Sequence, residues 1–184
     1  VKDIVGKDDI QIQKKEEDIN QLKGKLDVDL MGKSILKVTM DKPEIEQVLK
    51  SSLNLHKKEV KIGDSKVYLG CYCKIEILYK GKDSDDILAL QDDVYLSKEE
   101  ELVGVNSDML ASHQIDIVNH DCLVSPDDLG ESRILNVEFT AKGIIRVLSN
   151  EKVEMIKDAY SPNYSMDLIK NNTDIGIVHA NVCN

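Results

Sequence analysis

The sequence predicts a mainly β protein, built as an antiparallel β-sandwich or a partly open barrel with one or two short helices. Apolar residues occupy every second position over residues 67–79, which places them on one face of a long, half-buried strand. Shorter alternating runs follow, and turn-forming segments such as Gly63-Asp64-Ser65 separate them. Helical patterns are few, so sheets must form most of the core.

The first 37 residues are expected to form an N-terminal connector with short strands. The charged run at residues 14–18 indicates a solvated turn or a fraying helix. The main β domain is predicted over residues 38–162, and residues 163–184 are predicted to be a second connector, a candidate start for a further repeat.

A lead-in helix is predicted over residues 42–50. Asp41 is a suitable N-cap, Glu44 three residues later completes a capping box, and Pro43 fits the first turn. The apolar residues of this segment lie at helical spacing, and they are Ile45, Val48 and Leu49. We therefore expect a short helix packed on the sheet.

The remaining elements are expected to be strands, at residues 53–62, 66–79, 87–90, 94–102, 113–124, 133–148 and 152–158. Ser149-Asn150 lies between the last two runs. This pair predicts a hairpin that joins them.

Composition limits the classes of partner. The net charge is −10 with a pI near 4.9, and aromatic residues make up 4% of the chain with no Trp. A net negative surface repels phosphate backbones and anionic membranes, and few rings are available to stack on bases or sugars. No run approaches the length needed to span a bilayer, so we expect no nucleic acid partner and no membrane insertion.

Two thiols, Cys71 and Cys73, lie on one face of the long strand, while His120 and Cys122 share a face further along the chain. If the strands were neighbours, these four residues would suit a metal- or thiol-dependent enzyme. The alternative is that the cysteines are small apolar residues of the core, and this is the interpretation that we favour. A third alternative is a generic ligand-binding β module. We expect no catalytic residue, no metal and no cofactor, and four irregularly spaced cysteines suit a reducing cytosol.

One internal similarity stands out. Residues 10–19 align without gaps to residues 166–175, at an offset of 156, and three of ten positions are identical: Lys14/Lys170, Asp18/Asp174 and Ile19/Ile175. This pattern is consistent with one full repeat plus the opening of the next.

Three segments, in order, resemble a known family. The strand GCYCKIEILYKG at residues 70–81, the ending KVEMIKDAYSP at residues 152–162 and the lead-in VTMDKPEIEQVL at residues 38–49 resemble the SPOCS domain of SipL-type spore coat morphogenesis proteins. The resemblance is carried by Gly70, Ile75, Ile77, Tyr79, Asp158, Ala159, Tyr160, Ser161, Pro162, Asp41, Pro43, Ile45 and Leu49. The Cys pair, and Met40 where Pro is common, depart from the family pattern.

The resemblance implies a non-enzymatic structural or interaction module that supports coat assembly around the forespore, in the mother-cell cytoplasm. It implies tandem copies of the domain and a protein partner, either the coat basement-layer ATPase SpoIVA or another coat protein. It supplies no catalytic residues. Self-association through exposed strand edges is a further expectation.

Overall fold

The computed structural model describes residues 10–163, which form six antiparallel β-strands in two three-stranded sheets. The strands are β1 (Gln11–Lys37), β2 (Ile45–Gly63), β3 (Lys66–Gly81), β4 (Ile87–Glu101), β5 (Leu110–Ser125) and β6 (Ile134–Tyr160). The expected mainly β, antiparallel class is confirmed in its sandwich form. Across the described range there is no helix long and apolar enough to cross a membrane.

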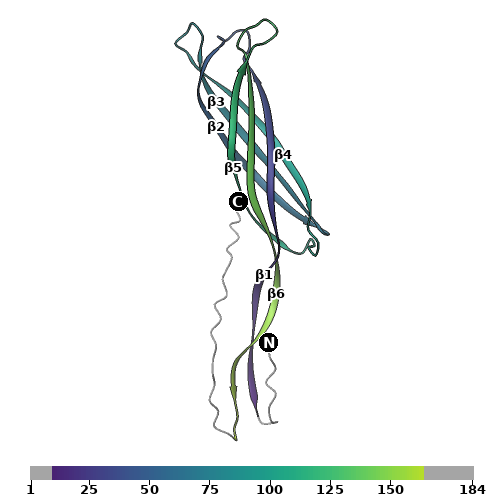
Figure 1. The fold of residues 1–184 in the computed structure, drawn as a ribbon. Helices are drawn as coiled ribbons and strands as arrows, with labels where there is room; N and C mark the ends of the chain where they lie inside the picture. Colours follow the sequence, from purple (N-terminus) through teal and green to yellow (C-terminus); the bar gives the residue numbers. More distant parts are fainter. Residues whose placement is uncertain (1–9, 164–184) are drawn as a thin grey trace.

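The two sheets have the strand orders β1-β6-β5 and β2-β3-β4. They stack so that β1 lies against β4 and β2 against β5 (Figure 1). The chain passes between the sheets after β1 and again after β4. Consequently β3 and β6 are the central strands, and the first and last strands are neighbours.

The core lies between the two central strands. Every second side chain of β3 is buried, as the alternation predicts, and these are Val67, Leu69, Cys71, Cys73, Ile75, Ile77 and Tyr79. From the other sheet, β6 contributes alternating residues that include Leu135, Val137, Phe139, Ala141 and Ile145. Phe139 lies over Gly32 of β1, where any Cβ would collide with its ring. Thus the ring of Phe139, the single Phe of the chain, occupies the space that a side chain at Gly32 would need.

Strands β1 and β6 extend well beyond the sandwich (Figure 1). We call the stacked part, residues 24–148, the body. The remainder of the two strands, residues 11–23 of β1 and residues 149–160 of β6, we call the ribbon. A register shift between Leu22 and Gly24 marks the junction, and Leu102 packs there so closely that a Cβ on Gly24 would lie 2.7 Å from its Cδ2.

The predicted lead-in helix at residues 42–50 is wrong, because a turn precedes β2 and the chain is extended from Ile45 onward. Register shifts fall between Ile45 and Gln47 and between Val48 and Lys50. Each shift adds one residue to β2, so Ile45 and Val48 both lie opposite inward-facing positions of β3 although they are three residues apart. The two register shifts therefore give the inward-facing apolar residues of this strand the three-residue spacing that is typical of a helix.

The expected connector at residues 1–37 with its short strands is, over its described part, one strand paired with β6 along its whole length. The charged run at residues 14–18 is extended and belongs to the ribbon. The predicted hairpin at Ser149-Asn150 is also wrong, because β6 continues through it with Gln21 and Asn20 of β1 alongside. The runs at residues 87–90 and 94–102 form the single strand β4. Residues 166–175 of the internal similarity lie outside the described residues, and the domain division remains a prediction.

Candidate functional site

The lead-in segment and the end of β3, two of the three family motifs, meet at one end of the body. The Pro43 ring packs on Gly81, where a Cβ would lie 2.5 Å from Pro43 Cγ. The Tyr79 hydroxyl donates to the Pro43 carbonyl at 3.5 Å, and Ile45 is buried in the core. Asp41 lies in the turn before β2, and the hydroxyl of Thr39 and a backbone N–H lower its pKa.

Arg133 fastens this segment to the start of β6. Its Nη1 donates to the carbonyls of Lys42 at 2.7 Å and Thr39 at 3.1 Å, and its Nε donates to Glu131 at 2.5 Å. Sequence reasoning missed Arg133, because its partners at Thr39 and Lys42 lie more than ninety positions away along the chain. No local sequence pattern predicts a contact between segments so far apart in the chain.

Glu44 completes the contact from the other side. Its carboxylate accepts from the Ser132 N–H at 2.9 Å and pairs with Lys82 Nζ at 3.2 Å. The Ser132 N–H and then Lys82 hold the pKa of Glu44 below its ordinary value. We call Arg133, Glu44, Lys82, Ser132 and the turn at residues 39–43 the clasp. Glu44, the residue expected to complete a helical capping box, instead joins two loops.

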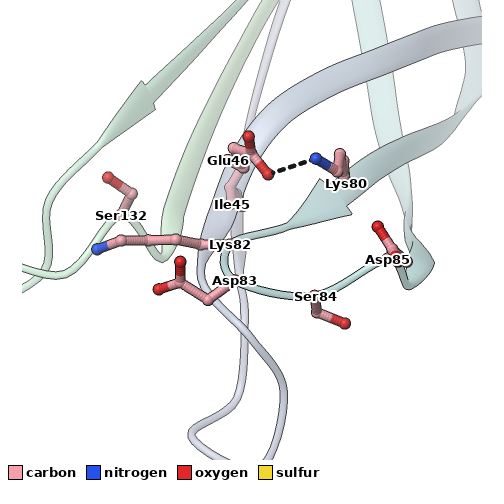
Figure 2. A pocket seen from close by; sticks show the side chains of 8 residues that line it. All are labelled: Ile45, Glu46, Lys80, Lys82, Asp83, Ser84, Asp85 and Ser132. Atoms are coloured by element: carbon pink, nitrogen blue, oxygen red, sulfur yellow. Dashed lines mark ion pairs between the residues drawn. The ribbon is translucent and has the colours of Figure 1, made fainter.

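Beside the clasp is an open hollow of about 600 Å³, shown in Figure 2. Glu46 and Lys80 form an ion pair of 2.9 Å on one side, and Asp83 and Asp85 belong to the loop that closes the other. Among residues 10–163, no three His, Cys, Asp or Glu side chains converge to hold a metal ion. The hollow therefore supplies no metal centre from described side chains.

The four residues of the alternative thiol or metal site do not form one site. Cys71 and Cys73 are fully buried between the sheets, and burial raises the pKa of the Cys73 thiol to about 11. His120 lies on β5, where its Nε2 is 2.8 Å from Ser51 Oγ of β2. Cys122 is half-buried, and burial raises its pKa also. These thiols are held protonated at neutral pH, which disfavours a nucleophilic role.

The outer face of the β2-β3-β4 sheet carries a cluster of rings, which we call the tyrosine platform: Tyr68, Tyr72, Tyr95 and His56. The Tyr72 ring centroid lies 5.0 Å from that of Tyr95 and 5.7 Å from that of His56. His56 is 2.8 Å from Asp93. Gly70 faces the platform, and a Cβ there would lie 2.7 Å from Tyr95 Oη. The glycine of the family motif thus leaves room for a ring, and it lines a hollow of about 250 Å³ beside Tyr68 and Tyr95.

The tyrosine platform was not predicted from the sequence. The aromatic content of the whole chain is low, and this average gives no information on whether the few rings lie together. Tyr68 and Tyr72 alternate with the buried residues of β3, which places them on the outer face. Tyr95 lies directly opposite Tyr72 on β4. The alternation signal predicts that Tyr68 and Tyr72 share a face, but the addition of Tyr95 depends on register.

The closing motif lies at the opposite end of the molecule from the clasp, at the tip of the ribbon (Figure 1). Ala159 is buried, whereas Tyr160 is exposed and its hydroxyl donates to Gln11 of β1. Ser161 and Pro162 follow the end of β6, and the Asn163 N–H donates to Ser161 Oγ at 3.3 Å. The structure therefore places the lead-in motif and the closing motif at opposite ends of the molecule. Between them, Gly70, Ile75 and Ile77 lie along β3, and Leu49 is half-exposed in β2.

The comparison with known families agrees with the strand motif at residues 70–81 and with the end of the lead-in motif, whereas the closing motif at residues 152–162 lies outside the matched segment. The chain matches the family described as SipL, SPOCS domain, over residues 44–125. This segment spans β2 to β5 and ends before β6. No curated protein and no solved structure gives a match to the chain. Over residues 44–125, less than half of the chain, the sequence is therefore similar to the SPOCS domain of the SipL family.

Proposed function

We propose that this protein is a non-enzymatic structural and interaction module in spore coat assembly, acting in the mother-cell cytoplasm at the surface of the forespore. The observation that carries the proposal is the SPOCS match over residues 44–125, since it ties the chain to a sporulation-related family. SpoIVA or another coat protein is the proposed partner.

The arrangement of the polar and reactive side chains supports a structural role. Cys71 and Cys73 are packed in the core, and Arg133 and Glu44 are occupied in joining loops. The motif residues Pro43, Gly81 and Gly70 provide close packing. Each of these groups contributes to the stability of a rigid body.

The tyrosine platform is the surface of the body best suited to protein contact. Tyr is enriched at the centres of interfaces, where its ring buries a large area at a small cost in conformational entropy. The tyrosine rings lie on β3, the central strand of its sheet, and on β4, and the His56 ring lies on β2 on the other side of β3. A rigid base of this kind holds the rings in place before a partner arrives.

Co-sedimentation of the purified chain with SpoIVA filaments tests the partner. We expect binding that falls at least about tenfold in Tyr72→Ala/Tyr95→Ala, a loss of roughly 1.4 kcal/mol or more. Met31→Ala/Leu123→Ala is the matched control, because Met31 and Leu123 are exposed on the other sheet. Equal loss in both variants would contradict a role for the platform.

A fluorescent fusion of the full protein in sporulating cells tests the wider proposal. We expect a shell of fluorescence around the forespore on its mother-cell side, and displacement of coat proteins in a deletion strain. Uniform fluorescence together with normal coats in the deletion strain would refute the coat role. Turnover of a substrate by the purified protein would refute the non-enzymatic assignment.

A further inference from the structure

The hollow of about 250 Å³ on the tyrosine platform is formed around Gly70. Tyr68 lies two residues before Gly70 on the outer face of β3, and Ser97 of β4 lies directly opposite Gly70. The Tyr95 hydroxyl reaches over the glycine, since a Cβ on Gly70 would lie 2.7 Å from Tyr95 Oη. The missing side chain therefore leaves a hollow that is bounded by two tyrosine rings.

Three hydroxyl groups at this hollow make no hydrogen bond within residues 10–163, and they belong to Tyr68, Tyr95 and Ser97. The two tyrosines are 42% and 58% exposed, so a ligand can reach their hydroxyls. A tyrosine or serine hydroxyl donates a hydrogen bond to a carbonyl oxygen. The hollow therefore combines apolar ring surface with donors for carbonyl acceptors.

The charged side chains that line the hollow are two carboxylates and two ammonium groups. Each is held in an ion pair with a neighbour: Glu59 with Lys61 at 3.0 Å, Lys98 with Glu100 at 2.8 Å, and Glu99 with Lys66 at 2.5 Å. A charged occupant would find no unpaired group of opposite sign among these side chains. Charge complementarity therefore favours an uncharged occupant.

An extended segment rich in proline has the properties that this surface requires. The polyproline II helix makes no internal hydrogen bonds, so its carbonyl groups are available as acceptors. It is already ordered before binding, and aromatic-lined grooves bind it for this reason. From Tyr68 to Tyr72 the strand runs about 13 Å, which is the length of about four residues of a polyproline II helix.

We propose that the hollow beside Gly70 binds an uncharged, proline-rich segment of the protein partner in the polyproline II conformation. A proline ring packs between Tyr68 and Tyr95, and the three hydroxyl groups donate to carbonyl groups of the segment. This inference rests on the proposed function, because it gives the chemistry of the partner at the tyrosine platform. A second copy of this sequence does not supply such a segment, since its three prolines stand singly and far apart.

Isothermal titration calorimetry of the full chain with an end-capped proline decamer tests the occupant. We expect saturable binding, at least about tenfold tighter than that of a glycine-serine decamer. The affinity should change less than about twofold between about 50 and 500 mM NaCl, because no charge takes part. Equal affinity for the two decamers would overturn the proposal. Tighter binding of an arginine-alanine decamer, or of a neutral glycan, would overturn it in favour of that ligand.

Substitutions locate the site and separate the rings from the hydroxyls. Tyr95→Ala is expected to weaken decamer binding at least about tenfold. Tyr160→Ala is the matched control, because Tyr160 is 59% exposed at the tip of the ribbon and Tyr95 is 58% exposed. Equal affinities in these two variants would place binding elsewhere and refute the proposal.

Tyr68→Phe/Tyr95→Phe keeps both rings and removes two donors. We expect decamer binding to weaken about three- to tenfold, which is the effect of one or two lost hydrogen bonds. Unchanged affinity in this variant would refute the assignment of the hydroxyls as donors to the segment.

The decamer and SpoIVA experiments fail separately. If Tyr72→Ala/Tyr95→Ala loses SpoIVA binding while no proline decamer binds, the platform contacts its partner by other chemistry; this inference is then wrong and the proposed function stands. If the decamer binds through Tyr95 while the coats of the deletion strain are normal, the proposed function is wrong and the binding site stands.

Discussion

The body and the ribbon are made from the same two strands, yet their surroundings differ completely. In the body, β1 and β6 bury one face against a second sheet, and side chains such as Leu135 and Val137 are fully inaccessible. In the ribbon the two strands pair only with each other within the described residues. The pairing of the ribbon is continuous apart from one register shift between Gln13 and Lys14, but among residues 10–163 no second sheet covers it. Backbone pairing alone does not make a stable unit, because two isolated strands are marginal in water.

The contrast explains where the charges of β1 lie. The ribbon part of β1 is mostly exposed and carries the run KKEED at residues 14–18. Its cross-strand contacts are ion pairs, Lys14 with Glu154 and Lys23 with Glu151. Exposed ion pairs of this kind contribute little to stability. We infer that the body holds nearly all of the folding free energy and that the ribbon opens far more readily.

Thiol labelling provides the largest expected difference between the two regions. In a Cys122→Ser/Cys183→Ser background, Cys71 and Cys73 are inaccessible in the core, so they react only when the body opens. A cysteine introduced by Val153→Cys in the ribbon is expected to react at least about 1,000-fold faster at pH 8. The raised pKa of Cys73, about 11, slows its reaction further. Mass spectrometry over time measures both rates.

The control for this comparison is the same experiment in denaturant, where all three thiols should react at similar rates. If Cys71 reacted as fast as the introduced cysteine in the folded protein, the inference that stability resides in the body would be wrong.

Truncation of core side chains gives the next largest effect. Phe139→Ala removes the ring that fills the space above Gly32, and we expect the free energy of unfolding to fall by about 3–5 kcal/mol. Val153→Ala in the half-buried ribbon should cost no more than about 0.8 kcal/mol. Urea denaturation followed by circular dichroism measures both. Equal losses would mean that the ribbon and the body unfold as one unit with a shared core.

Much of the body can be predicted from the sequence, because β3 repeats its apolar residues with the period of a strand. The same rule fails at Ile45 and Val48, where register shifts change the period to three. It fails again at Ser149-Asn150, because this pair permits a turn without requiring one. Pairing with β1 decides the outcome there, and that partner lies some 130 positions earlier in the chain.

The candidate site was predictable to a smaller extent. The motifs identified Pro43, Tyr79 and Gly70, and the structure gives each a packing role. Arg133 and Tyr95 were not identified, since their contacts depend on which loops and strands meet in space. Local patterns carry information on faces and turns, but not on contacts between distant segments.

Removal of the clasp arginine should have a moderate and local effect. Arg133→Met removes the guanidinium donor from the carbonyls of Thr39 and Lys42, although the Lys42 N–H still donates to the Thr39 carbonyl, and the loss of hydrogen bonds to a charged group lowers stability. We expect the melting temperature to fall by a few degrees and exchange of the amides at residues 39–45 to accelerate about tenfold. Arg146→Met, which replaces the only other arginine of the chain, is the control. Faster exchange in the ribbon would contradict a local role.

The smallest effect concerns the pH dependence of the clasp. The Ser132 N–H, and then Lys82, lower the pKa of Glu44 below its ordinary value of 4.5. A lowered carboxyl pKa stabilises the folded state above pH 4.5, and this contribution is lost as the pH falls through the folded-state pKa. Glu44→Gln should therefore show less loss of urea resistance between pH 6 and pH 3 than the unsubstituted chain. Lys82→Met should keep most of that loss, because the backbone N–H is the larger cause. If Lys82→Met behaved like Glu44→Gln, the ion pair with Lys82 rather than the Ser132 N–H would be the dominant interaction of Glu44 in the clasp.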